Sequence, residues 1–250
     1  MSATHHPLSL EKIIERQARF WELQLQQGKE KERPGRGKSG TLYFGPYLLI
    51  SREKGAGGRT VAALAAERLK WHVFDREIVD EIARRAKMRQ QLIESLDERV
   101  RGGLEEFIRD FLGHEVIAPE DYLYHLKQVL LTLGHQGSVV IVGRGAEYVL
   151  PGQFGLRVWM VAPLHVRIER VSKVEGITAE EARSHIEQVD KEREKFIRSN
   201  FQRGSRNPLD YDLVINTGSL SAENTTEILL SALESKFGVL CSNFAPAVDK

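Results

Sequence analysis

One ten-residue segment has the clearest potential for chemistry in this chain: Ser51-Arg52-Glu53-Lys54-Gly55-Ala56-Gly57-Gly58-Arg59-Thr60. It follows an apolar run at 47–50 and precedes a helix-like stretch at 61–69. A strand, a turn of small residues and a helix start form an anion site, because glycines let backbone N–H groups converge on a phosphate at the positive end of the helix dipole. The pattern predicts a phosphate-binding loop. A tight turn that binds no ligand is the alternative.

This loop departs from the usual phosphate-binding motif. That motif has a glycine, four residues, and then Gly-Lys-Ser/Thr. Here Arg52 stands at the first glycine, and Gly58 and Arg59 stand at the lysine and at the Ser/Thr. Because a transferring phosphoryl group needs a nearby cation, we expect Arg59 to replace the lysine, with Lys54 as a second candidate. The hydroxyl of Thr60 is the candidate magnesium ligand.

The rest of the sequence alternates strand-like and helix-like segments. The expected strands are 47–50, 72–74, 138–142, 156–161 and 212–216. Helices are expected at 77–86, over most of 90–134, around Arg167 and Arg170, from a capping box at 178–181, and at 222–237. Such alternation favours a parallel sheet with helices on both faces.

Charged residues follow the expected strands, where parallel sheets bind their ligands. Asp75 and Arg76 follow the second strand, and Arg144 lies between two glycines after the third. A later charged helix carries Asp190 and Arg193. Several arginines and a phosphate loop at one crevice indicate phosphoryl transfer, which depends on charge neutralisation and positioning.

Each of these residues also has a structural interpretation. Asp75 and Arg76 are compatible with a helix cap and a surface ion pair. Arg193 and Arg198 lie on a highly charged helix, where arginines are usually solvated. Arg144 is harder to explain without a ligand, because it interrupts a glycine turn after a buried strand.

Composition narrows the class of protein. Among 250 residues, 36 Lys and Arg balance 35 Asp and Glu, which disfavours nucleic-acid binding through bulk charge. Cys241 is the only cysteine, so an intrachain disulfide and a cysteine-based metal cage are excluded. The eight histidines show no metal-ligand spacing. With no membrane-span or signal-peptide pattern, we expect a soluble cytoplasmic protein without membrane or specific nucleic-acid partners.

The first 45 residues are expected to form a separate region. Ser9 can cap a helix whose apolar face includes Ile13, Trp21 and Leu25, and this face must cover either the domain or a partner subunit. Residues 28–40 read as a basic linker, with a nucleotide- or RNA-contacting arm as the minor alternative. This helix is the candidate surface for a homo-oligomer or another partner. Residues 239–250 are expected to form a tail.

The chain resembles the cytidylate kinase-like family, relatives of bacterial cytidylate kinase among the P-loop nucleoside monophosphate kinases. The resemblance spans about 47–237 and rests on segments 50–59, 74–78, 142–145, 190–193 and 211–217. It implies a three-layer α/β P-loop fold in 46–238, with a parallel sheet flanked by helices. Within it, 75–135 would be a helical region that binds the nucleoside monophosphate (NMP), and 187–206 a lid.

The resemblance also implies roles for individual residues. Those implied to bind the ATP phosphates are Gly55, Ala56, Gly57, Gly58, Arg59 and Thr60. Asp75, Arg76 and Arg144 would face the acceptor monophosphate, and Arg193 would complete the clamp on the transition state. True cytidylate kinases keep a loop lysine and an Asp-Gly-Arg-Asp sequence, whereas this chain has Gly58 and Val142-Gly143-Arg144-Gly145. Asp190 or Glu53 is expected to compensate for the missing carboxylates in placing magnesium, so the expected catalytic group is Arg59, Arg193 and Asp190.

The sequence thus predicts a kinase that transfers a phosphoryl group from ATP, with Mg²⁺, to a nucleoside monophosphate, CMP or dCMP first among them. The alternative is a non-catalytic nucleotide-binding regulatory module. The glycine at the lysine position separates the two, since losing a loop cation weakens transition-state stabilisation unless another cation replaces it.

Overall fold

The computed structural model describes residues 44–94, 96, 101–102, 122–204 and 206–238. The expected N-terminal helix, most of its linker and the C-terminal tail lie outside these residues. The described chain divides into two compact units. One contains the described residues of 77–135, and the other contains 44–76 and those of 136–238.

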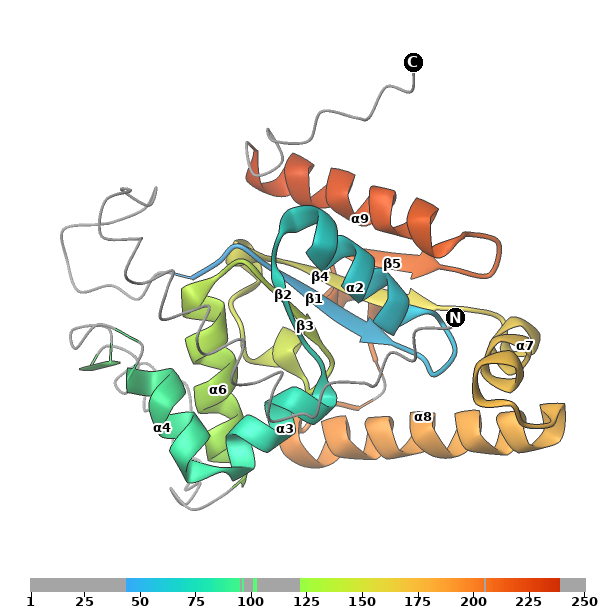
Figure 1. Cartoon of the computed structure of the whole chain (residues 1–250), viewed down its shortest axis with the longest axis horizontal. Coiled ribbons are helices and arrows are strands. Elements are labelled where there is room, and N and C mark those ends of the chain that lie inside the picture. Colours follow the sequence, from blue (N-terminus) through green and yellow to red (C-terminus); the bar gives the residue numbers. More distant parts are fainter. Residues whose placement is uncertain (1–43, 95, 97–100, 103–121, 205, 239–250) are drawn as a thin grey trace, which may run out of the picture. The chain divides into compact units, whose positions relative to one another are not determined.

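The second unit is built on a five-stranded, fully parallel sheet (Figure 1). Its strands are β1 (Tyr47–Arg52), β2 (His72–Phe74), β3 (Val139–Val142), β4 (Gly155–Val161) and β5 (Leu213–Asn216). They are arranged in the order β2-β3-β1-β4-β5, so β1 is the central strand. The predicted strands and the parallel α/β fold are confirmed.

Helices and short 3-10 turns connect these strands. The second unit contains α2 (Gly58–Leu69), α7 (Leu164–Glu175), α8 (Ala179–Phe201) and α9 (Ala222–Phe237), with 3-10 turns η1 (Ala146–Tyr148), η2 (Gly152–Phe154) and η3 (Pro208–Asp210). The predicted capping box at the start of α8 is present: Thr178 accepts from the N–H of Glu181, and the Glu181 carboxylate accepts from the N–H of Thr178. None of the described helices is long and apolar enough to cross a membrane.

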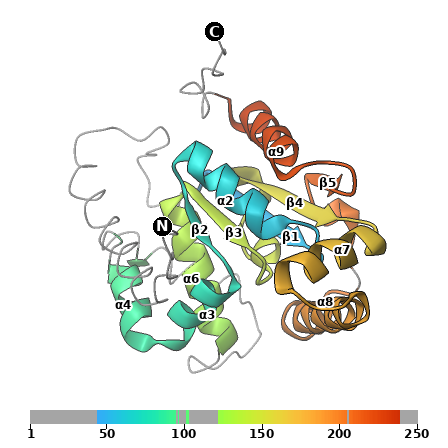
Figure 2. The same ribbon diagram turned by 45° about the vertical axis from the view of Figure 1, so that its right-hand side comes forward.

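The core on one face of the sheet explains how β1 presents its last residue. Leu48 and Ile50 pack in a buried cluster with residues of α2 and α9, which lie side by side in both views (Figures 1 and 2). Side chains alternate along a strand, so Ser51 points to the opposite face and Arg52 to the face that carries α2. The central strand therefore ends with an arginine directed toward the start of α2.

The described part of the first unit is helical. It contains α3 (Arg76–Arg84), whose first residue belongs to the second unit, α4 (Ala86–Glu94) and α6 (Tyr122–Gln136). In α3, Ile78, Val79 and Ile82 are buried at helical spacing, as predicted. The hydroxyl of Tyr122 donates to Asp80 at 2.5 Å and connects α6 to α3. That this region binds a nucleoside monophosphate stays a prediction.

Candidate functional site

The glycine turn between β1 and α2 has the geometry of an anion site. Helix α2 begins at Gly58, and its N-cap residue Gly57 has a left-handed backbone, with φ at +83°, and no side-chain cap. The first N–H groups of a helix have no acceptor within the helix. They therefore point outward at the positive end of the α2 dipole, as phosphate binding requires.

The two cations predicted to replace the loop lysine are engaged elsewhere. Arg59 has a side chain 78% exposed, and its guanidinium lies 3.3 Å from the carboxylate of Asp75. The Lys54 ammonium lies 2.6 Å from Glu175 of α7, and this hydrogen bond lowers the pKa of Glu175. Thr60 is exposed in the first turn of α2. The predicted roles of Arg59 in catalysis and of Thr60 in metal binding stay predictions.

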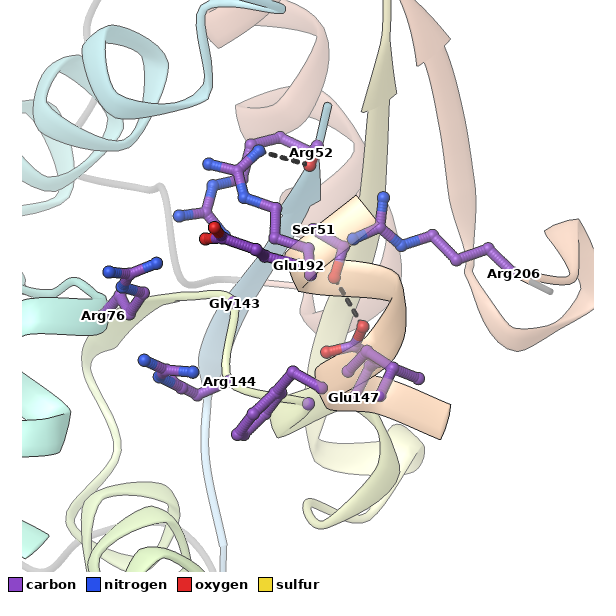
Figure 3. A pocket seen from close by; sticks show the side chains of 12 residues that line it. Ser51, Arg52, Arg76, Gly143, Arg144, Glu147, Glu192 and Arg206 are labelled. Carbon is purple, nitrogen blue, oxygen red and sulfur yellow. Dashed lines mark hydrogen bonds between the residues drawn. The ribbon is translucent and has the colours of Figure 1, made fainter. Parts of the chain in front are cut away.

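A cavity of about 200 Å³ lies beyond the carboxyl ends of β1 and β3 (Figure 3). Its lining residues are Ser51, Arg52, Arg76, Gly143, Arg144, Gly145, Glu147, Glu192, Arg193, Phe196, Ile197 and Arg206. We call it the arginine pocket, because five arginines from separate segments outnumber its two glutamates. The structure thus brings together three of the predicted site residues, Arg76, Arg144 and Arg193.

Arg144 is held in an unusual conformation. Its φ is +60°, in the left-handed region that residues with a Cβ seldom adopt, and its guanidinium lies 4.5 Å from the centre of the Phe196 ring of α8. Backbone strain of this kind is concentrated at functional sites, where the surrounding structure enforces it. The role of Arg144 in binding the acceptor stays a prediction.

Arg193 anchors the α8 side of the arginine pocket. Its Nη1 donates to the carbonyl oxygen of Arg52 at 3.2 Å and to Asp190 at 3.4 Å, and its buried Nε makes no hydrogen bond to any described residue. Burial lowers the pKa of Arg193, and the charges of Arg206 and Arg76 lower it further, while Asp190 opposes the shift. The pocket therefore has a positive potential that a bound anion would relieve.

The carboxylate of Asp190 joins three segments around the glycine turn. It accepts from the N–H of Lys54 at 2.8 Å, from Arg167 of α7 at 2.5 Å, and from Arg193. The neighbouring Glu53 accepts from the N–H of Ala162 at 3.1 Å. These contacts explain how the loop is positioned against α7 and α8. The predicted catalytic role of Asp190 is not tested by them.

A buried polar group that sequence reasoning missed is part of the lining of the arginine pocket. Glu147 is 8% exposed and accepts from the hydroxyl of Ser51 at 2.5 Å and from that of Tyr211 at 3.1 Å. Burial, and then the Glu147 charge, raises the pKa of Tyr211. Strand alternation could have placed Ser51 opposite Arg52, but Glu147, Phe196 and Arg206 had no local signal that linked them to one site.

The described side chains do not by themselves form a binding site for Mg²⁺. Among the described residues, no group of three or more His, Cys, Asp or Glu side chains could hold a metal ion. Of the carboxylates in the arginine pocket, Glu147 is already bound by two hydroxyls. Magnesium commonly binds through one or two protein ligands plus substrate phosphates, so its main ligands here would come with the nucleotide.

Comparison with known proteins identifies the family. Residues 48–219 match the family described as the cytidylate kinase-like family. The chain belongs to this family. A cytidylate kinase of Methanopyrus kandleri is 35% identical over 108 residues, which are 40% of this chain and 56% of the relative. A cytidylate kinase of Methanocaldococcus jannaschii is 28% identical over 191 residues, which are 75% of this chain and 97% of the relative.

The relatives are matched over different shares of their own length. The chain spans about half the length of the first curated relatives that it matches, at 56% and 51% of their lengths. Among solved structures, an uncharacterized protein from Eubacterium ventriosum has a TM-score of 0.60 and 22% identity, over 76% of this chain and 98% of that one. This likeness supports the fold of the cytidylate kinase-like chain.

Proposed function

We propose that this protein is a nucleotide kinase that transfers the γ-phosphoryl group of ATP to a nucleoside monophosphate, with CMP or dCMP as the preferred acceptor. The observation that carries the proposal is the convergence of Arg52, Arg76, Arg144, Arg193 and Arg206 in one pocket next to the glycine turn. Family membership and the names of the curated relatives favour cytidylate.

The arginine pocket suits this reaction because both substrates are polyanions. A phosphate oxygen of the acceptor attacks the γ-phosphorus of ATP, and the bond from this phosphorus to the bridging oxygen breaks. ADP leaves with the bonding electron pair, and the acceptor becomes a diphosphate. The attacking oxygen is already ionised at neutral pH, so the chemistry needs positioning and charge neutralisation more than a general base.

The proposed division of roles follows the positions of the residues. The N–H groups at Gly55 to Thr60 would hold the donor phosphates at the start of α2. Arg76 and Arg144 would bind the acceptor phosphate, with Asp75 nearby, and Arg193 would clamp the transferring group. Magnesium would bind mainly to the ATP phosphates, with the hydroxyl of Thr60 as the proposed protein ligand.

A turnover assay tests the proposal. Purified protein is incubated with ATP, Mg²⁺ and each of CMP, dCMP, UMP, AMP and GMP, and diphosphate formation is measured. We expect the highest kcat/KM with CMP or dCMP. Nucleotide binding without diphosphate formation from any monophosphate would instead support the regulatory module.

The regulatory alternative rests on the absence of a lysine from the loop position that the motif requires. Gly58 occupies the lysine position, and Asp190 already accepts from a loop N–H at Lys54. A protein that senses a nucleotide without turning it over needs no catalytic cation in the loop. The two functions therefore differ in whether another cation reaches the transferring phosphoryl group.

A further inference from the structure

The side chain of Arg52 extends across the glycine turn. A Cβ atom on Gly58 would lie 2.9 Å from Cγ of Arg52 and 3.1 Å from its Cβ, and a Cβ on Gly143 would clash with its Nη1. The stem therefore runs over the first residue of α2, and the guanidinium reaches the carboxyl end of β3. This path follows from the position of Arg52 at the end of β1, on the face that carries α2.

Two of the three departures from the phosphate-binding motif, those at positions 52 and 58, are sterically coupled. Residue 52 carries an arginine where the motif has its first glycine, and residue 58 is a glycine where the motif has its lysine. A side chain at 58 would collide with the stem of Arg52 close to its backbone, where it has little freedom to move. The arginine thus requires the glycine. The cationic side chain that crosses the start of α2 therefore comes from position 52.

We propose that Arg52 is the catalytic cation of this loop and donates to oxygens of the transferring phosphoryl group. The inference rests on the proposed function. Arg52 lines the arginine pocket together with Arg76, Arg144 and Arg193, and its guanidinium lies at the ends of the two neighbouring strands β1 and β3. A guanidinium stays charged and presents a planar fork of donors, which matches phosphoryl oxygens.

The rival cations of the loop are less well placed. Arg59 lies in the first turn of α2, is 78% exposed and pairs with Asp75. Lys54 pairs with Glu175 of α7. Neither lines the arginine pocket. Arg52 meets both requirements of the missing lysine, because it contacts the start of α2 and reaches the pocket.

Exchange of the two positions gives the sharpest test. The variants are Arg52→Gln, Arg52→Ala, Gly58→Lys and the double variant Arg52→Gly/Gly58→Lys, which restores the first glycine and the lysine of the usual motif. Arg59→Ala tests the rival, and Arg183→Ala, an exposed arginine paired with Glu187, is the matched control. Steady-state kinetics give kcat, calorimetry gives the affinities for ATP and ADP, and thermal unfolding verifies that each variant is folded.

We expect Arg52→Gln and Arg52→Ala to lower kcat about a hundredfold or more and to abolish the preference for ATP over ADP. Gly58→Lys alone also loses activity, because it displaces the Arg52 stem. The double variant recovers kcat about tenfold or more over either Arg52→Ala or Gly58→Lys, a non-additive result that shows the two positions to be coupled. Arg183→Ala stays at the parent level.

Opposite results would overturn the inference. One such result is that the folded Arg52 variants keep kcat and the preference for ATP within about threefold of the parent. The other is that Arg59→Ala lowers kcat more than Arg52→Gln does. If the parent phosphorylates no monophosphate, the proposed function fails, and Arg52 is judged by calorimetry alone. The catalytic role then fails with the proposed function, but the contact of Arg52 with the γ-phosphate is supported if the parent prefers ATP and Arg52→Gln does not. That contact is refuted if the parent binds neither nucleotide or if Arg52→Gln keeps the preference.

Discussion

The two ends of the parallel sheet hold their arginines in different ways. At the amino ends, Arg157 of β4 donates to both carboxylate oxygens of Asp212, at 3.1 and 3.3 Å, and Lys236 of α9 donates to the same carboxylate at 2.9 Å. At the carboxyl ends, five arginines share a pocket with two glutamates, one of which is bound by hydroxyls. At the first end two cations share hydrogen bonds with one carboxylate, whereas at the second end five arginines from separate segments face one cavity.

The pKa values of one arginine at each end, Arg157 and Arg193, shift in opposite directions. Its hydrogen bond with Asp212 raises the pKa of Arg157, despite partial burial. Burial, reinforced by neighbouring arginines, lowers the pKa of Arg193. A paired charge at the surface contributes to stability, while several like charges that gather in one cleft are typical of a ligand site. We therefore expect changes at the amino ends to affect stability, and changes at the carboxyl ends to affect nucleotide binding and turnover.

The largest effect is expected at the glycine turn. Gly57→Val should lower ATP affinity about a hundredfold or more, because a branched side chain blocks the approach of phosphate to the backbone. Isothermal titration calorimetry measures this. Gly176→Val is the matched control, since both glycines have a positive φ and open space at the Cβ position. Equal ATP affinity in folded Gly57→Val and Gly176→Val proteins would refute the phosphate-loop assignment.

Arg193 provides the next test. Arg193→Ala should lower kcat about a hundredfold, on the scale of losing one preorganised charged donor. Arg183→Ala, on the same helix but exposed, should leave kcat unchanged. Steady-state kinetics with ATP and CMP compare the two variants. Parallel values for them would place Arg193 among the structural arginines and remove the contrast between the two ends of the sheet.

Arg76 and Arg144 test whether the arginine pocket has separate donor and acceptor sides. Alanine at either position should raise the KM for the monophosphate about tenfold or more and change the KM for ATP much less, because both are proposed to bind the acceptor phosphate. Initial rates measured with each substrate varied in turn separate the two constants. Similar changes in both KM values would contradict the division into donor and acceptor sides.

The smallest effect is expected at the amino ends, and it concerns stability. Asp212→Asn should lower the free energy of unfolding by about 1–2 kcal/mol at pH 7, since it weakens the hydrogen bonds to Arg157 and Lys236. Nucleotide turnover should not change. Urea denaturation of parent and variant measures the difference in stability. A variant with full stability but reduced turnover would reverse the comparison.

The same variant has a pH dependence of known sign. Burial alone would raise the pKa of Asp212, but hydrogen bonds from Arg157 and Lys236 hold it below its ordinary value of 3.8. Its contribution to stability is therefore present above about pH 4 and is lost as pH falls through the lowered folded-state pKa. The difference between parent and Asp212→Asn should shrink in acid. A difference that stays constant as the pH falls would contradict this origin.

Local patterns were sufficient for most of the fold. The buried strands, the capping box at Thr178 and the closing helix α9 were predicted close to their observed bounds. These features depend on residues that are neighbours along the chain, and alternation of strands and helices then favours a parallel sheet. The strand order, with β1 between β3 and β4, needed the tertiary structure.

The candidate site was only partly readable from the sequence. Arg76, Arg144 and Arg193 were selected because they follow strands or lie on the charged helix, and they do line one pocket. Arg206 and Glu147 had no local pattern that pointed to the same place. Arg198, a weaker candidate, is exposed and pairs with Glu194 at 2.7 Å, in agreement with its solvated interpretation.

By itself, the sequence determined that a glycine turn joins a strand to a helix and that this turn lacks the lysine of the phosphate-binding motif, and it predicted an anion site there. Only the tertiary structure decided which cation lies across it. Arg52 and Arg59 both flank the turn, but the alternation of β1 and the absence of a side chain at Gly58 direct Arg52 into the pocket, while Arg59 pairs with Asp75 near the surface. Strand alternation gives the face on which Arg52 lies, but what it reaches there depends on residues such as Gly58 and Gly143 that pack against it in the folded chain.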